Sequence, residues 1–252
     1  MATLKRLMVW GLCWTMGGAL AADCAAPKPG ADLSGCDFSR KSLAGKDLRG
    51  ANLVGAKLEN TDLRRADLSG ADLSRANAKW AHFDGARLVG ATLKNADLFH
   101  AIFDNADLQK ANLSGAYLFG ANLIGARAQG ADFSQAYLKD ILMEDIDLSG
   151  GSVKNCYAFR GVLMGAKLLG TDMSGADFTG AAAENADFTG AKLHGTRLGG
   201  ATLRFAEFSR ADLQGADFSH ADLWNARFDK SLNRPPSLTE ALAEAFTGSA
   251  KP

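Results

Sequence analysis

The residues best suited to chemistry in this 252-residue chain are histidines, cysteines and carboxylates, and none of them forms a known catalytic pattern. The four histidines stand far apart, at His82, His100, His194 and His220. No GxSxG, HExxH, CxxC, phosphate-loop or dinucleotide fingerprint occurs. We therefore expect no enzyme, no metal site and no bound cofactor.

The aspartates recur at regular places, directly before leucines, as at Asp67, Asp72, Asp97 and Asp107. An array of carboxylates is one interpretation of this pattern. The other is that each short polar side chain bonds the backbone of the turn that follows it, as Asp side chains often do. We expect the second.

The overall charge argues against nucleic acid as a partner. Lys and Arg together number 28, and Asp and Glu together number 28. A chain without net charge has no field strong enough to hold a polyanion or to imitate one. Nucleic-acid binders and nucleic-acid mimics are both disfavoured.

The N-terminus reads as a leader for export. Residues 1–22 carry Lys5 and Arg6, then an apolar stretch, then the small residues Ala19 and Ala21 before a cleavage site. The apolar stretch is about 14 residues long, short of the roughly 20 that a spanning helix needs. We expect a cleaved signal peptide, a periplasmic or secreted protein, and no stable membrane span in the mature chain.

Export permits disulfides, and three cysteines remain after residue 22: Cys24, Cys36 and Cys156. Cys24 and Cys36 are close in sequence, and Pro27 and Pro29 stiffen the loop between them. We expect a Cys24–Cys36 disulfide that fastens the N-terminal extension to the body.

The element that must position all these residues is a repeat. From residue 31 to residue 230 the chain divides into 40 consecutive blocks of five without an insertion or deletion. The central residue of the block is Leu in 24 blocks and Phe in 9, and the residue two before it is Ala in 29. In an extended segment these two positions point to the same side, so each block has a small and a large side chain facing a core. The pattern predicts a β-solenoid whose repeats bury their apolar side by stacking.

These A(D/N)LxG blocks resemble the pentapeptide-repeat family over about 200 residues of the chain. The resemblance implies an all-β fold, a right-handed quadrilateral parallel β-helix with one block per side and four per coil, hence about ten coils. The sequence supports four blocks per coil, because Tyr117, Tyr137 and Tyr157 lie 20 residues apart. Cys36 and Cys156 would then be six coils apart, about 29 Å, too far for a disulfide. Cys156 is expected to be a buried thiol.

The chain thus divides into a signal peptide (1–22), an N-terminal cap segment (23–30), the repeat β-helix (31–230) and a C-terminal tail (231–252). Pro235 and Pro236 break the repeat. Ser237 to Glu240 reads as a capping box, which opens a short capping helix that extends to about Phe246.

Outward aromatic residues gather on one side of the expected solenoid, the second side, which starts at Cys36. We call this set the aromatic side: Trp80, Phe99, Tyr117, Phe119, Tyr137, Tyr157 and Phe159. The third side adds an apolar flank: Ile102, Ile124, Leu142, Val162 and Met164. Contiguous apolar surface usually marks an interaction site, although aromatic ladders also stabilise neighbouring strands. We favour an interface.

The function expected is therefore a non-enzymatic scaffold that binds a protein partner, or its own copy, through the aromatic side. Stacking of a glycan or small ligand on the rings is an alternative. Some pentapeptide-repeat proteins interact with DNA gyrase by imitating acidic, rod-like DNA. That alternative is weaker, because the charges summed over the four sides are −1, 0, −3 and +2.

The core pattern changes near residue 150. Successive inward positions read Ile141, Ile146, Gly151, Cys156 and Gly161. Ile141 should lie one coil below Gly161, so a large and a small residue can compensate in packing. A local bulge that shapes the binding surface is the alternative, and we favour compensation.

Overall fold

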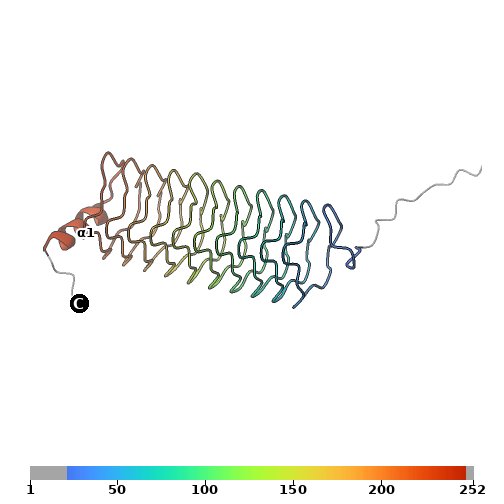
Figure 1. Cartoon of the computed structure of the whole chain (residues 1–252). Helices are drawn as coiled ribbons and strands as arrows, with labels where there is room; N and C mark the ends of the chain where they lie inside the picture. The colour runs from blue at the N-terminus through green and yellow to red at the C-terminus, as the bar shows by residue number, and fades with distance from the viewer. Residues whose placement is uncertain (1–21, 248–252) are drawn as a thin grey trace, which may run out of the picture.

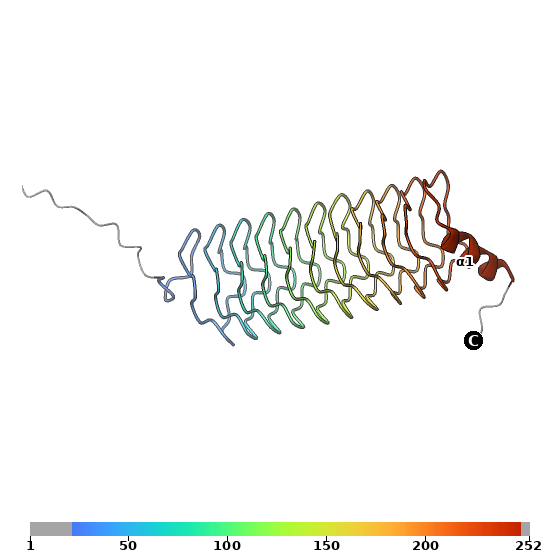
Figure 2. The same ribbon diagram turned by 180° about the vertical axis from the view of Figure 1, so that it is seen from behind.

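The structure, a computed structural model, describes residues 22–247. The predicted signal peptide, residues 1–22, lies outside this range apart from Ala22. The repeat winds into a row of stacked coils that runs from the N-terminal to the C-terminal end, where helix α1 lies (Figures 1 and 2). We number the four sides of a coil from residue 31, so that the first coil spans residues 31–50 and the last coil spans residues 211–230.

The coils are joined by parallel bridges between residues 20 positions apart, from Asp32–Asn52 to Asp212–Leu232. Each block contributes one bridge residue, so the expected strands occur as isolated bridges and not as long ladders. The reason is the length of a side. A chain that turns every five residues leaves only about three residues extended.

Each corner is a tight turn closed by a backbone hydrogen bond, as from the Ala51 N–H to the Leu48 carbonyl (3.0 Å). The last residue of the block adopts a positive φ, which glycine tolerates at no steric cost. About half of the corners lack glycine. Trp80 (φ 52°) and Phe205 (φ 59°) are bulky residues held in this conformation.

The core is the double lining that the repeat predicts. The central Leu and Phe side chains are buried along the whole solenoid, and so are the Ala residues two positions before them, except Ala31 and Ala226 at the ends, which are partly buried. Phe208 stacks on Phe188 and Phe228, with ring centroids 4.6 and 4.8 Å apart. Where Thr replaces Ala, its hydroxyl donates to a buried carbonyl, as from Thr61 to Phe38 (2.9 Å). At the positions where Thr replaces Ala, the buried hydroxyl therefore has a hydrogen-bond partner.

The N-terminal segment is fastened to the first coil. Cys24 and Cys36 form a disulfide with their Cα atoms 5.5 Å apart, and the Asp23 N–H donates to the Asp32 carbonyl. Cys156 is a buried free thiol, and its burial raises the pKa of the thiol far above its usual value. A protonated, enclosed thiol is a packing residue and not a nucleophile.

Helix α1 (Pro236–Thr247) packs on the last coil. It begins one residue before the predicted Ser237, since proline fits the first helical position. Leu238 and Ala241 are buried. The Ser237 hydroxyl accepts from the Phe218 N–H (3.2 Å) and lies 3.3 Å from the Ala216 carbonyl, to which it donates.

Candidate binding surface

The centre of the aromatic side is a column of three tyrosines on successive coils. Tyr117 and Tyr137 are bridge partners, as are Tyr137 and Tyr157. Their ring centroids are 5.0 and 5.3 Å apart, and the ring planes differ by 19° and 38°. Tyr117 is 40% exposed and Tyr157 is 36% exposed. The column exists because the 20-residue period places the same block position on each coil.

Phenylalanines form a second column beside the tyrosines. Phe99 stacks on Phe119 (5.6 Å, 9°) and on Tyr117 (6.3 Å, 7°), and Tyr157 stacks on Phe159 (6.2 Å, 5°). At the N-terminal end of the array, Trp80 meets Phe99 edge to face (5.3 Å, 83°). All seven predicted aromatic residues are thus brought into one connected array.

The rings shield one another's faces. Successive rings in the middle of the array are near-parallel, with centroids 5.0 to 6.3 Å apart, so they cover part of one another's faces. A sugar ring stacks on an aromatic face and not on an edge. The stacked rings therefore leave few free faces for a sugar to stack on.

Charged groups near the rings are mostly paired. Arg160 donates to both carboxylate oxygens of Asp140 (2.8 and 2.9 Å) and lies over the Phe159 ring. The Lys79 ammonium is 3.2 Å from Asp97. Lys139 lies over the Phe119 ring, 5.8 Å from its centroid. The array is therefore apolar at its centre with a paired polar margin, as interfaces commonly are.

The predicted apolar flank is weaker than its sequence indicates. Ile102, Leu142 and Val162 share one column on the third side, but Asn122 interrupts it. Of the five flank residues only Met164 is exposed (39%), and the other four are half-buried. The flank borders the aromatic side without forming a surface of its own.

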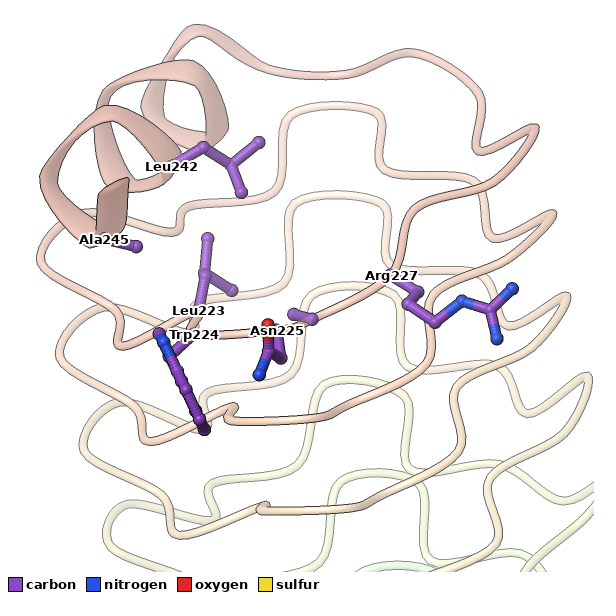
Figure 3. A pocket seen from close by; sticks show the side chains of 7 residues that line it. Leu223, Trp224, Asn225, Arg227, Leu242 and Ala245 are labelled. Atoms are coloured by element: carbon purple, nitrogen blue, oxygen red, sulfur yellow. The ribbon is translucent and has the colours of Figure 1, made fainter. Parts of the chain in front are cut away.

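A cavity at the C-terminal end is a feature that the sequence did not reveal. It lies between α1 and the last coil, and Leu223, Asn225, Leu242 and Ala245 line it together with Trp224 (Figure 3). Trp224 stands out in the sequence as an outward aromatic residue. The cavity itself depends on where α1 rests, which no repeat pattern states.

The repeated aspartates bond their own turns, which confirms the second interpretation above. Asp67 accepts from the Ser69 N–H (3.0 Å), and Asp72 accepts from the Ser74 N–H (2.8 Å). Within residues 22–247 no group of three or more His, Cys, Asp or Glu residues is placed to hold a metal ion. No helix in the same range has the length and apolar character to cross a bilayer.

These turn carboxylates make stability depend on acid. Two hydrogen bonds from the Arg64 guanidinium lower the pKa of Asp62 from 3.8 to about 2. A carboxyl group whose pKa is lower in the folded chain stabilises the fold at pH values above its pKa in the unfolded chain. This stabilisation is lost as the pH falls through the pKa in the folded chain. We expect the melting temperature to drop between about pH 4 and pH 2, by a modest amount from this exposed pair.

Thermal melts of Asp62→Asn test this directly. The melting temperature of the variant should lie below that of the parent at neutral pH, and the two should converge near about pH 2. A difference that stays constant with pH would show that the carboxylate charge is not its origin.

Comparison with known proteins identifies the repeat. A family model described as pentapeptide repeats matches in eight copies, which together cover residues 30–150 and 162–231. The chain belongs to the pentapeptide-repeat family. Members of this family form right-handed quadrilateral β-helices, in agreement with the 20-residue period described above.

Solved structures of pentapeptide-repeat proteins resemble the chain at low identity. HetL from the cyanobacterium Nostoc sp. strain PCC 7120, involved in regulation of heterocyst differentiation, is 28% identical over 82% of this chain and 90% of its own, with a TM-score of 0.44. A trypsin-treated form of QnrB1, a plasmid-mediated fluoroquinolone resistance protein, is 22% identical over 84% and 98%, with a TM-score of 0.45. A thylakoid-lumen protein from Arabidopsis thaliana is 26% identical over 66% and 75%, with a TM-score of 0.12. No curated protein sequence matches.

Proposed function

We propose that this pentapeptide-repeat protein is an exported, non-enzymatic scaffold that binds a protein partner through the aromatic side. The scaffold is a solenoid of about ten coils with α1 as its C-terminal cap. The observation that carries the proposal is the connected array of seven aromatic residues on one side. Three of its members, Trp80, Tyr117 and Tyr157, are more than a third exposed. Aromatic residues in contiguous exposed patches are typical of protein interfaces.

The corner residue Trp80 supports an interaction role. Trp80 occupies a corner with φ 52°, a conformation that costs a residue with a bulky side chain on the order of 1–2 kcal/mol. Asn or Gly would occupy the same corner at lower cost. A bulky residue that is 45% exposed gains little from burial, so the Trp80 side chain is available for a contact outside the chain.

Export is proposed on the N-terminal residues and the disulfide. Residues 1–22 have the pattern of a signal peptide, and the Cys24–Cys36 bond persists in oxidising compartments such as the periplasm or the extracellular space. Fractionation of cells that express the full chain, with mass spectrometry of the N-terminus and of the bonded cysteines, tests this. Full-length, reduced protein in the cytoplasm would overturn it.

A triple variant tests the binding surface. Tyr117→Ser, Tyr137→Ser and Tyr157→Ser together remove the central column, and we expect at least about a tenfold loss of partner retention in affinity capture, since exposed aromatic anchors carry much of the energy of an interface. The matched control changes the opposite side of the same coils: Arg127→Ser, Asp147→Ser and Lys167→Ser. It should capture the partner as the parent does.

A purely structural ladder predicts a different result. Stacked rings stabilise adjacent coils, so the tyrosine variant should also melt at a lower temperature. Loss of stability with unchanged capture and unchanged oligomeric state would reject the interface. Capture of the chain by its own copy, shown by light scattering, would identify the partner as a second copy.

A further inference from the structure

The cavity beside α1 measures about 400 Å³, and its walls are partly apolar and partly polar: Leu242, Ala245 and Trp224 lie on the apolar part, and Asn225 and Arg227 supply polar atoms. Leu242 and Ala245 of α1 face Leu223, Trp224 and Asn225 of the last coil across it (Figure 3). Trp224 is 50% exposed. A space of this size accommodates one large side chain or a small ligand.

Trp224 is held in place from the coil below. The Phe205 ring meets it perpendicularly, at 4.8 Å and 82°, a contact that occupies at most one face of the indole. Phe205 lies at a corner with φ 59°, which bulky residues rarely adopt. The Phe205 ring therefore fixes one side of the indole that borders the cavity.

Backbone groups beside the cavity lack the partners that every lower coil has. In the coil below, the N–H groups of Leu203 and Phe205 donate to carbonyls of the last coil (2.8 and 2.9 Å). The Ala201 carbonyl of that lower coil accepts from an N–H of the last coil (2.9 Å). This arrangement is one unit of the parallel stack.

The equivalent groups of the last coil are the N–H of Leu223, the N–H of Asn225 and the carbonyl of Ala221. None of the three has a hydrogen-bond partner among residues 22–247. They form an open edge with the spacing of a parallel bridge, and such edges bind extended chains.

The first two sides of the same coil are closed. On the first side Leu232 bridges Asp212, and on the second side the Ser237 hydroxyl occupies the bridge position between Phe218 and Ala216. The described part of the chain thus closes the first two sides and leaves the third and fourth sides open, and the cavity lies at the third.

We propose that the third side of the last coil binds an extended peptide segment of a partner protein. The peptide pairs with the open edge as the next coil would, and it inserts one large apolar side chain into the cavity against Leu223 and Leu242. Main-chain hydrogen bonds supply affinity and the cavity supplies specificity, as in other cases of strand addition.

The charge of the last coil indicates which kind of residue comes directly before the large apolar residue of the peptide. That residue lies over Asp222, in the bridge column of the third side. Asp222 already bonds Arg204 of the coil below. Asp67 shows that one such carboxylate can serve two arginines, with Arg49 below it (3.9 Å) and Arg87 above it (3.7 Å). Elsewhere in the solenoid, an aspartate in a bridge column bonds an arginine one coil later, as Asp177 does with Arg197 and Asp107 with Arg127. The favoured peptide therefore reads small, basic, large apolar.

The chain contains that pattern itself, and its residues 85–90 (GARLVG) provide the probe. Acetyl-GARLVG-amide is titrated to about 5 mM into the ¹⁵N-labelled protein, a range suited to weak binding. We expect saturable shifts of the Leu223 and Asn225 amides and of the Trp224 indole N–H. Absence of these shifts would overturn the proposal.

Two matched changes separate edge pairing from adventitious contact. The same peptide methylated on the backbone nitrogen of its arginine has no N–H there to donate to the Ala221 carbonyl. It should bind about fivefold more weakly. Ala245→Phe fills the cavity and should abolish the shifts, whereas Trp80→Ala, on the aromatic side, should leave them unchanged. Equal binding of the methylated peptide, or binding that survives Ala245→Phe, would reject the site. Saturable shifts with cellohexaose but not with the peptide would assign it to saccharides and likewise reject the proposal.

This site does not rest on the aromatic side. The triple tyrosine variant should bind the probe like the parent, so failure of the scaffold proposal and failure of the peptide proposal are distinguishable.

Discussion

Phe208→Ala is expected to lower the free energy of unfolding by about 3–5 kcal/mol, the usual cost of truncating a buried phenylalanine. Phe208 is fully buried, with Phe188 stacked below it, Phe228 stacked above it and Phe218 against it edge to face (5.7 Å). Removing the middle ring of a stack exposes the faces of both neighbours. The void cannot close, because the coil spacing is set by the backbone bridges on either side.

The loss should be concentrated in the last coils. In a repeat protein each unit contacts only its neighbours, so disturbance of one coil spreads mainly to the coils beside it. Chemical denaturation gives the overall change, and amide hydrogen exchange shows where protection is lost. Exchange should rise in residues 180–230 before it rises in residues 31–150.

Phe205→Ala provides the control, since it removes the same side chain three residues away. Phe205 is 48% exposed and lies outside the core. Its truncation should cost less than about 1 kcal/mol, as surface substitutions usually do. Equal losses for Phe205→Ala and Phe208→Ala would show that stacking within the core is not what holds the coils together.

The register of the solenoid is predictable from the sequence because it depends on one period. The central residue of every block is apolar and in most blocks large, and the bridges from Asp32–Asn52 to Asp212–Leu232 keep that period throughout. Burial follows from the same rule, including that of Cys156 in a slot otherwise filled by alanine. No long-range contact has to be guessed, since each residue meets the one 20 positions later.

The details of the surface do not follow from the period. The sequence places seven aromatic residues on one side, but the orientation of each ring depends on side-chain torsions and on its neighbours. The rings shield one another's faces, a result that changes which partner fits. The cavity at Trp224 depends on how Leu242 and Ala245 of α1 rest on the last coil, and α1 lies outside the repeat.

The stretch that the family model leaves unmatched, residues 151–161, is also where the inward positions depart from alanine. Gly151 and Gly161 each lack a β-carbon where most coils have one. Comparison of repeats alone predicts that alanine at either position restores the consensus and raises stability. The surroundings of the two glycines predict the opposite.

Gly151→Ala is expected to destabilise the protein by about 3 kcal/mol, at the upper end for overpacking a core. A β-carbon on Gly151 would lie 2.7 Å from the Ala131 carbonyl oxygen, 2.8 Å from Leu148 Cδ1 and 3.0 Å from the Leu148 carbonyl oxygen. Two of these atoms belong to backbone that is fixed by coil-to-coil hydrogen bonds. The chain must therefore shift between adjacent coils, and the bridge from Asp132 to Ser152 should weaken. Equilibrium unfolding measures the loss, and a gain in stability would contradict this account.

Gly161→Ala separates backbone crowding from side-chain compensation. Its β-carbon would lie 3.2 Å from the Ala158 carbonyl oxygen and 3.3 Å from Ile141 Cγ2, so one of its two close neighbours is a side chain that can be removed. We expect a loss of about 1 kcal/mol, smaller than for Gly151→Ala. In the background of Ile141→Ala the added methyl should cost less or become favourable, because it occupies part of the space that isoleucine left. A double-mutant cycle with a coupling of about 1 kcal/mol would establish that Ile141 and Gly161 compensate in volume. Additive losses would instead attribute Gly161 to backbone crowding alone, and would favour the bulge as the reason why this stretch departs from the repeat.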